Sequence, residues 1–261
     1  MTDPAASGLV RERHHHVMVL RLDRPEARNA LTMAMLSDLC AALDEAELDP
    51  LIRVVVLTGT GDRAFCAGMD LRSFRDPNMS EERATRVMAR FQQLLAGDIS
   101  VPIIGAANAS ALAGGLELLL GCDIVVASSH ARFGLPEVSR GLFPGGNGTT
   151  LGTRIPLAIA LELALTGERI DAARASSLGL VNAVVDPADV LPTALAYAGR
   201  IARNAPLGVA AAKELVRLWV TDPARAATRL RELQPLVFQS EDAQEGATAF
   251  VEKRDPVWRG R

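Results

Sequence analysis

Three segments within residues 102–127 decide the fold of this chain: Pro102-Ile103-Ile104-Gly105-Ala106, then Gly114 to Leu120, then Ile124-Val125-Val126-Ala127. The first and last are short apolar runs with β-branched residues, which are typical of strands buried on both faces. The middle segment is typical of a short, very apolar helix, and it follows a Gly-Gly pair. This order of strand, turn, helix and strand predicts an α/β fold.

Two strands are expected near the N-terminus, where Leu9 to Arg13 and Val17 to Leu22 alternate apolar and polar residues. They predict a β-hairpin that is closed around His14-His15-His16. Three imidazoles can bind a metal ion, but neighbouring strand residues point to opposite faces and a turn offers no fixed cage. We therefore interpret the histidines as a solvated turn.

Helices and strands continue to alternate between the hairpin and the central segment. Thr32 can cap a helix that runs to about Leu48, where Pro50 follows. Val54 to Thr58 is a continuous, mostly β-branched run and predicts another buried strand. A further helix is expected from about Ser80 to Ala96. The pattern indicates an α/β core of stacked ββα turns.

The pattern changes from about Thr149, because helical periodicity then dominates and only Val181 to Val185 resembles a strand. The expected helices cover residues 157–165, 172–178, 190–203, 206–220 and 223–238. Apolar residues such as Leu215 and Trp219 must bury a face, either in a partner subunit or in the core of the same chain. We predict a core at residues 1–195 and a helical region at residues 196–261.

Composition excludes several classes of protein. The formal charge of −3 and the pI near 5.9 argue against a nucleic-acid surface. Cys40, Cys66 and Cys122 are scattered in apolar or glycine-rich surroundings, which indicates reduced packing thiols and no disulfide framework. Met1 to Gly8 lacks the features of a signal peptide, and no apolar run approaches about 18 residues. We expect a cytoplasmic protein without a membrane partner.

Two carboxylates, Glu117 and Glu137, stand directly behind turns, in Ala113-Gly114-Gly115-Leu116-Glu117 and in Phe133-Gly134-Leu135-Pro136-Glu137. A pair of carboxylates can divide proton transfers at neighbouring carbons if the fold brings them together. The Gly-Gly pair opens a helix whose free N–H groups favour an anion, although close packing requires small residues equally often. The turns match neither a dinucleotide fingerprint nor a phosphate loop, which argues against NAD and ATP chemistry.

Several motifs in one order resemble the enoyl-CoA hydratase/isomerase family, the crotonases. The resemblance starts at Arg24 to Leu31, and it ends at Ala249 to Arg254. Between these ends it covers residues 65–71, 108–123, 133–149, 165–167 and 179–181. The resemblance implies a crotonase-like spiral of ββα turns with a C-terminal helical trimerisation region. A homotrimer or a dimer of trimers is the implied assembly.

The resemblance also implies roles for individual residues. The oxyanion-hole amides fall on Met69 and Gly114, and the catalytic glutamates fall on Glu117 and Glu137. The amide of Gly145 matches one that helps to hold the catalytic water. The implied binding residues for coenzyme A and substrate are Ala27, Arg28, Ala67, Gly68, Asp70 and Leu71. Nearby cations that can meet the phosphates are Arg24, Arg28, Arg72 and Arg75.

The sequence departs from the family pattern at two positions. Asn147 stands where the loop usually has a glycine. Asparagine tolerates left-handed backbone angles, and its amide can also reach into the pocket. Ala113 replaces the first of three glycines that are common at the start of the oxyanion helix.

The implied function is reversible syn addition of water to a trans-2-enoyl-CoA. No metal or redox cofactor is implied, since coenzyme A is part of the acyl-CoA substrate. The C-terminal tail from Ser240 to Arg261 resembles that of carnitinyl-CoA dehydratase, so this or another specialised crotonase, including an enoyl-CoA isomerase, is an alternative. A non-catalytic acyl-CoA-binding protein is the alternative from another class.

Overall fold

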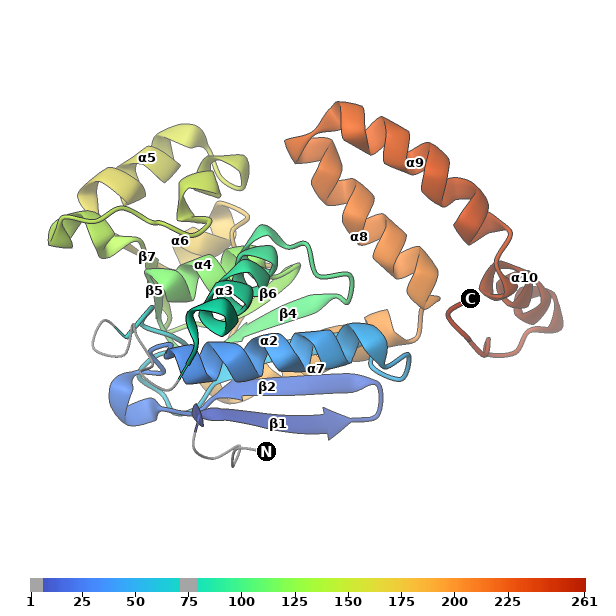
Figure 1. The fold of residues 1–261 in the computed structure, drawn as a ribbon, viewed down its shortest axis with the longest axis horizontal. Helices are drawn as coiled ribbons and strands as arrows, with labels where there is room; N and C mark the ends of the chain where they lie inside the picture. The colour runs from blue at the N-terminus through green and yellow to red at the C-terminus, as the bar shows by residue number, and fades with distance from the viewer. Residues whose placement is uncertain (1–6, 71–78) are drawn as a thin grey trace.

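A six-stranded sheet forms the centre of the computed structural model, which describes residues 7–70 and 79–261 (Figure 1). Its strand order is β1-β2-β3-β4-β6-β9. The first two strands form the expected antiparallel hairpin, and the other neighbouring pairs are parallel. The strands are β1 (Leu9–His14), β2 (Val17–Leu22), β3 (Val54–Gly59), β4 (Ile103–Ala107), β6 (Ile124–Ser128) and β9 (Ala183–Val185).

Both faces of this sheet are covered. Successive strand residues point to opposite faces, so Val54 and Val56 of β3 pack with helix α7 (Val190–Ala202). On the other face, Val55 and Leu57 belong to the core cluster that includes residues of α2 (Met33–Leu48) and α3 (Glu81–Ala96). All six residues of β3 are buried, as predicted from the β-branched run. Thr32 caps α2 by accepting a hydrogen bond from the N–H of Met35.

A second, smaller sheet was not predicted from the sequence. Its order is β5-β7-β8, and these strands have only two or three residues each. The strands are β5 (Ala111–Leu112), β7 (Arg132–Gly134) and β8 (Arg169–Asp171). Helix α4 (Gly114–Gly121) follows β5 directly, and α6 (Ala172–Ser177) follows β8. Four 3₁₀ helices are also present in the described residues: η1 (Pro25–Ala27), η2 (Pro136–Arg140), η3 (Gly148–Thr153) and η4 (Pro187–Asp189).

The C-terminal part is helical, as expected. Its helices are α5 (Leu157–Thr166), α8 (Pro206–Thr221), α9 (Pro223–Phe238) and α10 (Glu241–Glu252). Figure 1 shows α8 and α9 side by side, with α10 next to the C-terminus. The predicted division between residues 195 and 196 falls inside α7 and stays a prediction. In the part of the chain that the structure describes, no helix is long and apolar enough to cross a membrane.

Candidate active site

Helix α4 begins at an unusual turn that places its N-terminus against the loop before residue 70. Ala113 has φ 53° and ψ −131°, a conformation that favours glycine. A Cβ atom on Gly115 would lie 2.1 Å from the carbonyl oxygen of Cys66. The helix therefore packs directly on the backbone of this loop, and position 115 must be glycine.

The amides of Met69 and Gly114 are neighbours at this contact. The N–H of Leu31 donates to the carbonyl of Gly68 at 2.8 Å, and the N–H of Asp70 donates to the carbonyl of Leu31 at 2.9 Å. In this parallel bridge, the N–H of Met69 points away from Leu31. A Cβ atom on Gly114 would lie 3.7 Å from the Met69 nitrogen. Because Gly114 opens α4, its N–H has no acceptor within the helix.

Glu117 lies one turn further into α4, and only 6% of its surface is exposed. Its Oε1 accepts hydrogen bonds from the N–H groups of Gly146 at 2.8 Å and Gly148 at 2.9 Å. A Cβ atom on Gly146 would lie 2.7 Å from the other carboxylate oxygen, Oε2. The two amides therefore hold the carboxylate in one orientation, and no side chain fits at position 146 without moving it.

Glu137 has a different environment. It lies in η2 and is half-buried, and its Oε2 is buried without a hydrogen-bond partner among the described residues. Burial raises the pKa of Glu137, and the negative charge of Glu117 raises it further. The N–H of Glu137 itself and the cation of Arg140 act in the opposite direction. The net effect is a pKa of Glu137 above its ordinary value, whereas Glu117 lies in a different setting, against two backbone N–H donors.

The predicted binding loops for coenzyme A meet near Met69. The N–H of Ala67 donates to the carbonyl of Arg28 at 3.1 Å, so the segment with Ala27 and Arg28 lies beside the segment from Ala67 to Asp70. Gly68 has φ +97°, which requires glycine. Arg24 forms an ion pair with Asp70 at 3.2 Å, so its guanidinium is already bound to a carboxylate. Leu71, Arg72 and Arg75 lie outside the described residues.

The loop after Glu137 differs in part from the sequence-based interpretation. Gly145 is exposed, and its predicted role in holding water stays a prediction. The two amides that hold Glu117, those of Gly146 and Gly148, were not singled out. Asn147 has φ −104° and ψ 8°, so left-handed angles are not required there. Its Nδ2 donates to the carbonyl of Leu95 in α3, a protein contact that the sequence did not reveal.

The opposite end of α4 is held by cations. Arg217 donates to the carbonyls of Gly121 and Cys122, each at 3.0 Å, and Arg154 donates to the carbonyl of Leu120 at 3.0 Å. Arg217 and Lys213 of α8 both form ion pairs with Asp123 at 2.8 Å. Positive groups at a helix C-terminus are stabilising. Helix α8 is therefore anchored to the helix that carries Glu117.

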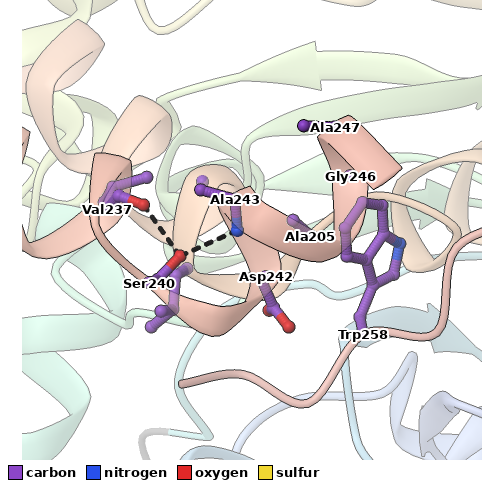
Figure 2. A pocket seen from close by; sticks show the side chains of 10 residues that line it. Ala205, Val237, Ser240, Asp242, Ala243, Gly246, Ala247 and Trp258 are labelled. Carbon is purple, nitrogen blue, oxygen red and sulfur yellow. Dashed lines mark hydrogen bonds between the residues drawn. The ribbon is translucent and has the colours of Figure 1, made fainter. Parts of the chain in front are cut away.

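The three cysteines are buried, and a separate cavity lies near the C-terminus. Burial raises the pKa of Cys40, Cys66 and Cys122 to about 12, and all three are unpaired, which fits packing thiols. A cavity of about 210 Å³ lies between α8, α10 and the C-terminal tail (Figure 2). Figure 2 shows the Ser240 hydroxyl, which donates a hydrogen bond to the carbonyl of Val237 and accepts one from the N–H of Ala243. The Trp258 ring lies beside Gly246. Neither glutamate lines this cavity.

Comparisons with known proteins show the family of this chain. The family model of enoyl-CoA hydratase/isomerase matches residues 12–261. Enoyl-CoA hydratase EchA19 of Mycobacterium tuberculosis is 39% identical over 255 residues, which cover 96% of each chain. Carnitinyl-CoA dehydratase of Proteus mirabilis is 36% identical, covering 94% of this chain and 95% of its own.

The fold is similar to solved structures of the same kind. The crystal structure of enoyl-CoA hydratase from Mycobacterium tuberculosis H37Rv has a TM-score of 0.88 and 39% identity, with 98% of this chain and 100% of that chain covered. The predicted α/β fold class is thereby confirmed. The family predicted from the motifs is confirmed as well, because both the sequence model and the relatives span nearly the whole chain. The chain belongs to the enoyl-CoA hydratase/isomerase family, the crotonases.

Proposed function

We propose that this protein is an enoyl-CoA hydratase, which adds water across the double bond of a trans-2-enoyl-CoA in the syn sense. The observation that carries the proposal is the contrast between two carboxyl groups. Glu117 is buried and accepts two backbone N–H bonds, whereas burial and the charge of Glu117 raise the pKa of Glu137. Such a difference separates a general base from a general acid.

The backbone amides of Met69 and Gly114 would bind the thioester carbonyl oxygen. Both hydrogen bonds strengthen as the carbonyl becomes an enolate, which is worth roughly 3 to 4 kcal/mol per donor in comparable sites. This polarisation makes Cβ electrophilic. The positive end of the α4 dipole adds to the same stabilisation.

The two glutamates would then transfer the protons. Glu117 takes a proton from water as the water oxygen bonds to Cβ, and the π electrons move toward the carbonyl. Glu137 gives its proton to Cα, which restores the thioester carbonyl and leaves a 3-hydroxyacyl-CoA. The amide of Gly145 would help to hold the water. The reaction needs no metal or redox cofactor, because two carboxyl groups and two amides supply the proton transfers and the charge stabilisation.

The experiment follows the loss of enoyl-thioester absorbance with a panel from crotonyl-CoA to long-chain enoyl-CoA and crotonobetainyl-CoA. We expect Glu117→Gln and Glu137→Gln to lower kcat by at least about 100-fold while CoA-thioester binding is retained. Activity confined to crotonobetainyl-CoA would identify a carnitinyl-CoA dehydratase. Movement of a 3-enoyl double bond without hydration would identify an isomerase. Binding without turnover would identify a non-catalytic acyl-CoA-binding protein.

We also propose that the C-terminal helices assemble the chain into a homotrimer or a dimer of trimers. No residue of α8 is buried within the chain, although the helix has a clear apolar side. Large apolar side chains are exposed there and on α9, namely Val216, Trp219, Val220, Leu236 and Phe238. Several large exposed apolar side chains on neighbouring helices are typical of a subunit interface. Sedimentation equilibrium measures the mass directly, and a monomer at micromolar concentration would contradict the proposal.

A further inference from the structure

Asn147 lies between the two residues that hold Glu117. The N–H groups of Gly146 and Gly148 donate to Oε1 of Glu117, and we call these two amides the clamp. Asn147 stands between them in the chain. The residue is only 8% exposed, and its backbone angles lie outside the left-handed region that favours glycine or asparagine. The backbone conformation therefore does not explain why an amide side chain is buried here.

The side chain connects the clamp to α3. Nδ2 of Asn147 donates to the carbonyl of Leu95, in the last turn of α3. Carbonyls in the last turn of a helix lack intrahelical donors, so Asn147 completes the end of α3. The same turn contacts α4, because a Cβ atom on Gly121 would lie 2.3 Å from the carbonyl oxygen of Leu94. The end of α3 therefore contacts both the helix that carries Glu117 and the loop that orients it.

Burial of Asn147 also has a cost. Its Oδ1 is buried and has no hydrogen-bond partner among the described residues. An unpaired buried acceptor lowers stability. The side chain is thus better explained by what its donor holds in place than by a contribution to the stability of the fold.

We propose that Asn147 is a positioning residue that fixes the direction of the Glu117 carboxylate by tying the Gly146 and Gly148 amides to the end of α3. The inference rests on the proposed hydratase function, in which Glu117 is the base. Without the hydrogen bond from Asn147 to Leu95, the loop can move and the Glu117 carboxylate can rotate. A displacement of about 1 Å in a catalytic group can slow a reaction by about 100-fold.

Asn147→Ala tests the proposal, with Thr153→Ala as the matched control. Thr153 lies at the other end of η3, where its exposed hydroxyl donates to the carbonyl of Thr150. We expect Asn147→Ala to lower kcat for enoyl-thioester hydration by roughly 10- to 100-fold with KM changed less than about threefold. The control should keep its kcat within about twofold. An unchanged kcat in Asn147→Ala, with Glu117→Gln inactive, would overturn the proposal.

A double mutant separates positioning from a general structural effect. If Asn147 acts through Glu117, adding Asn147→Ala to Glu117→Gln changes the residual rate, measured at high enzyme concentration, by less than about twofold. Multiplication of the two single effects would show that Asn147 acts independently of Glu117, and the proposal would be wrong. If the alanine variant does not fold, Asn147→Asp replaces it, because aspartate keeps the volume but removes the donor.

Amide hydrogen exchange tests, without any assay of activity, whether the hydrogen bond from Asn147 to Leu95 holds the loop in place. We expect the Gly146 and Gly148 amides to exchange at least about tenfold faster in Asn147→Ala than in the wild type, while amides in β3 are unchanged. Equal protection in both proteins would overturn the proposal, whatever reaction the enzyme catalyses. A wild-type protein that hydrates none of the tested thioesters would instead refute the proposed function, and the exchange comparison would still decide the tie.

Discussion

Glu137 is raised in pKa first by burial and then by the negative charge of Glu117, so two carboxyl groups from different elements interact across one site. Helix α4 supplies one and η2 supplies the other. Two backbone amides compensate the charge of Glu117, while the buried oxygen of Glu137 has no partner in the described part of the chain. The two carboxyl groups therefore lie in different environments.

The raised pKa of Glu137 predicts a pH-dependent cost in stability. The folded state binds this proton more tightly than the unfolded chain, so stability falls as pH rises from the ordinary value of 4.5 through the raised pKa. Glu137→Gln cannot ionise and escapes this cost. We expect its melting temperature to exceed that of the wild type by roughly 1–3 °C at neutral pH and to equal it near about pH 4. A difference that is independent of pH would contradict this explanation.

Arg140 should affect the pKa of the Glu137 carboxyl group. Glu137 and Arg140 are three residues apart in η2, and such side chains lie on one side of a 3₁₀ helix. The cation lowers the pKa of Glu137, so Arg140→Gln raises it. If Glu137 is the acid in hydration, the alkaline limb of the pH profile of kcat/KM moves upward by a few tenths of a unit, as expected for an exposed charge. Arg140→Lys is the control and should leave the limb in place.

Two adjacent glycines should respond differently to alanine. A Cβ atom on Gly146 would lie 2.7 Å from Oε2 of Glu117, whereas the nearest atom to a Cβ on Gly145 is 3.9 Å away. We expect Gly146→Ala to lower kcat by about 100-fold, because the carboxylate must move. Gly145→Ala should lower it by less than about fivefold. Steady-state kinetics of both variants measure the contrast, and equal losses would show that the clamp is not sterically limited.

Ala113 should be a site of stored strain. Its φ of 53° with ψ of −131° is costly for a residue with a Cβ atom. Ala113→Gly relieves this strain but increases the entropy of the unfolded chain. We expect a net gain of about 1 kcal/mol in the free energy of unfolding, measured by denaturant titration. Ala113→Val should lose at least about 2 kcal/mol, since a β-branched side chain is least tolerated at positive φ.

Asp123 should be the key residue in the anchoring of α8. It forms ion pairs with Lys213 and Arg217, and its carboxylate also accepts a hydrogen bond from the N–H of Ile103 at 2.7 Å. Asp123→Ala leaves two partly buried cations without their anion and should cost about 3–5 kcal/mol in the free energy of unfolding. The combined variant with Lys213→Met should lose less than the sum of the single variants. Full additivity would show that the ion pair contributes little.

Long elements could be predicted from the sequence because their patterns are strong. The Thr32 cap, the buried run from Val54 and the helical periodicity before Ala96 all correspond to elements of the structure. The second sheet could not be predicted, since Ala111–Leu112 and Arg169–Asp171 are too short to show a period. Helix α10 (Glu241–Glu252) was also not predicted as a separate helix.

The site was accessible to sequence reasoning only in part. The two glutamates stood out by their motifs, and the structure brings them within electrostatic reach. The clamp from Gly146 and Gly148 depends on contacts between segments far apart in sequence, which a glycine-rich loop does not reveal. The same holds for the bond between Asn147 and Leu95. Roles that depend on tertiary distance have no local signature.

Position 147 offers a route for laboratory evolution of this enzyme. Its neighbours are closed to side chains, because a Cβ atom would lie 2.7 Å from Glu117 at position 146 and 2.5 Å from Pro144 at position 148. The angles at position 147 itself, φ −104° and ψ 8°, lie outside the left-handed region, so this position does not require glycine. A saturation library at this single codon would therefore vary the hold of α3 on the loop without requiring a left-handed backbone at position 147.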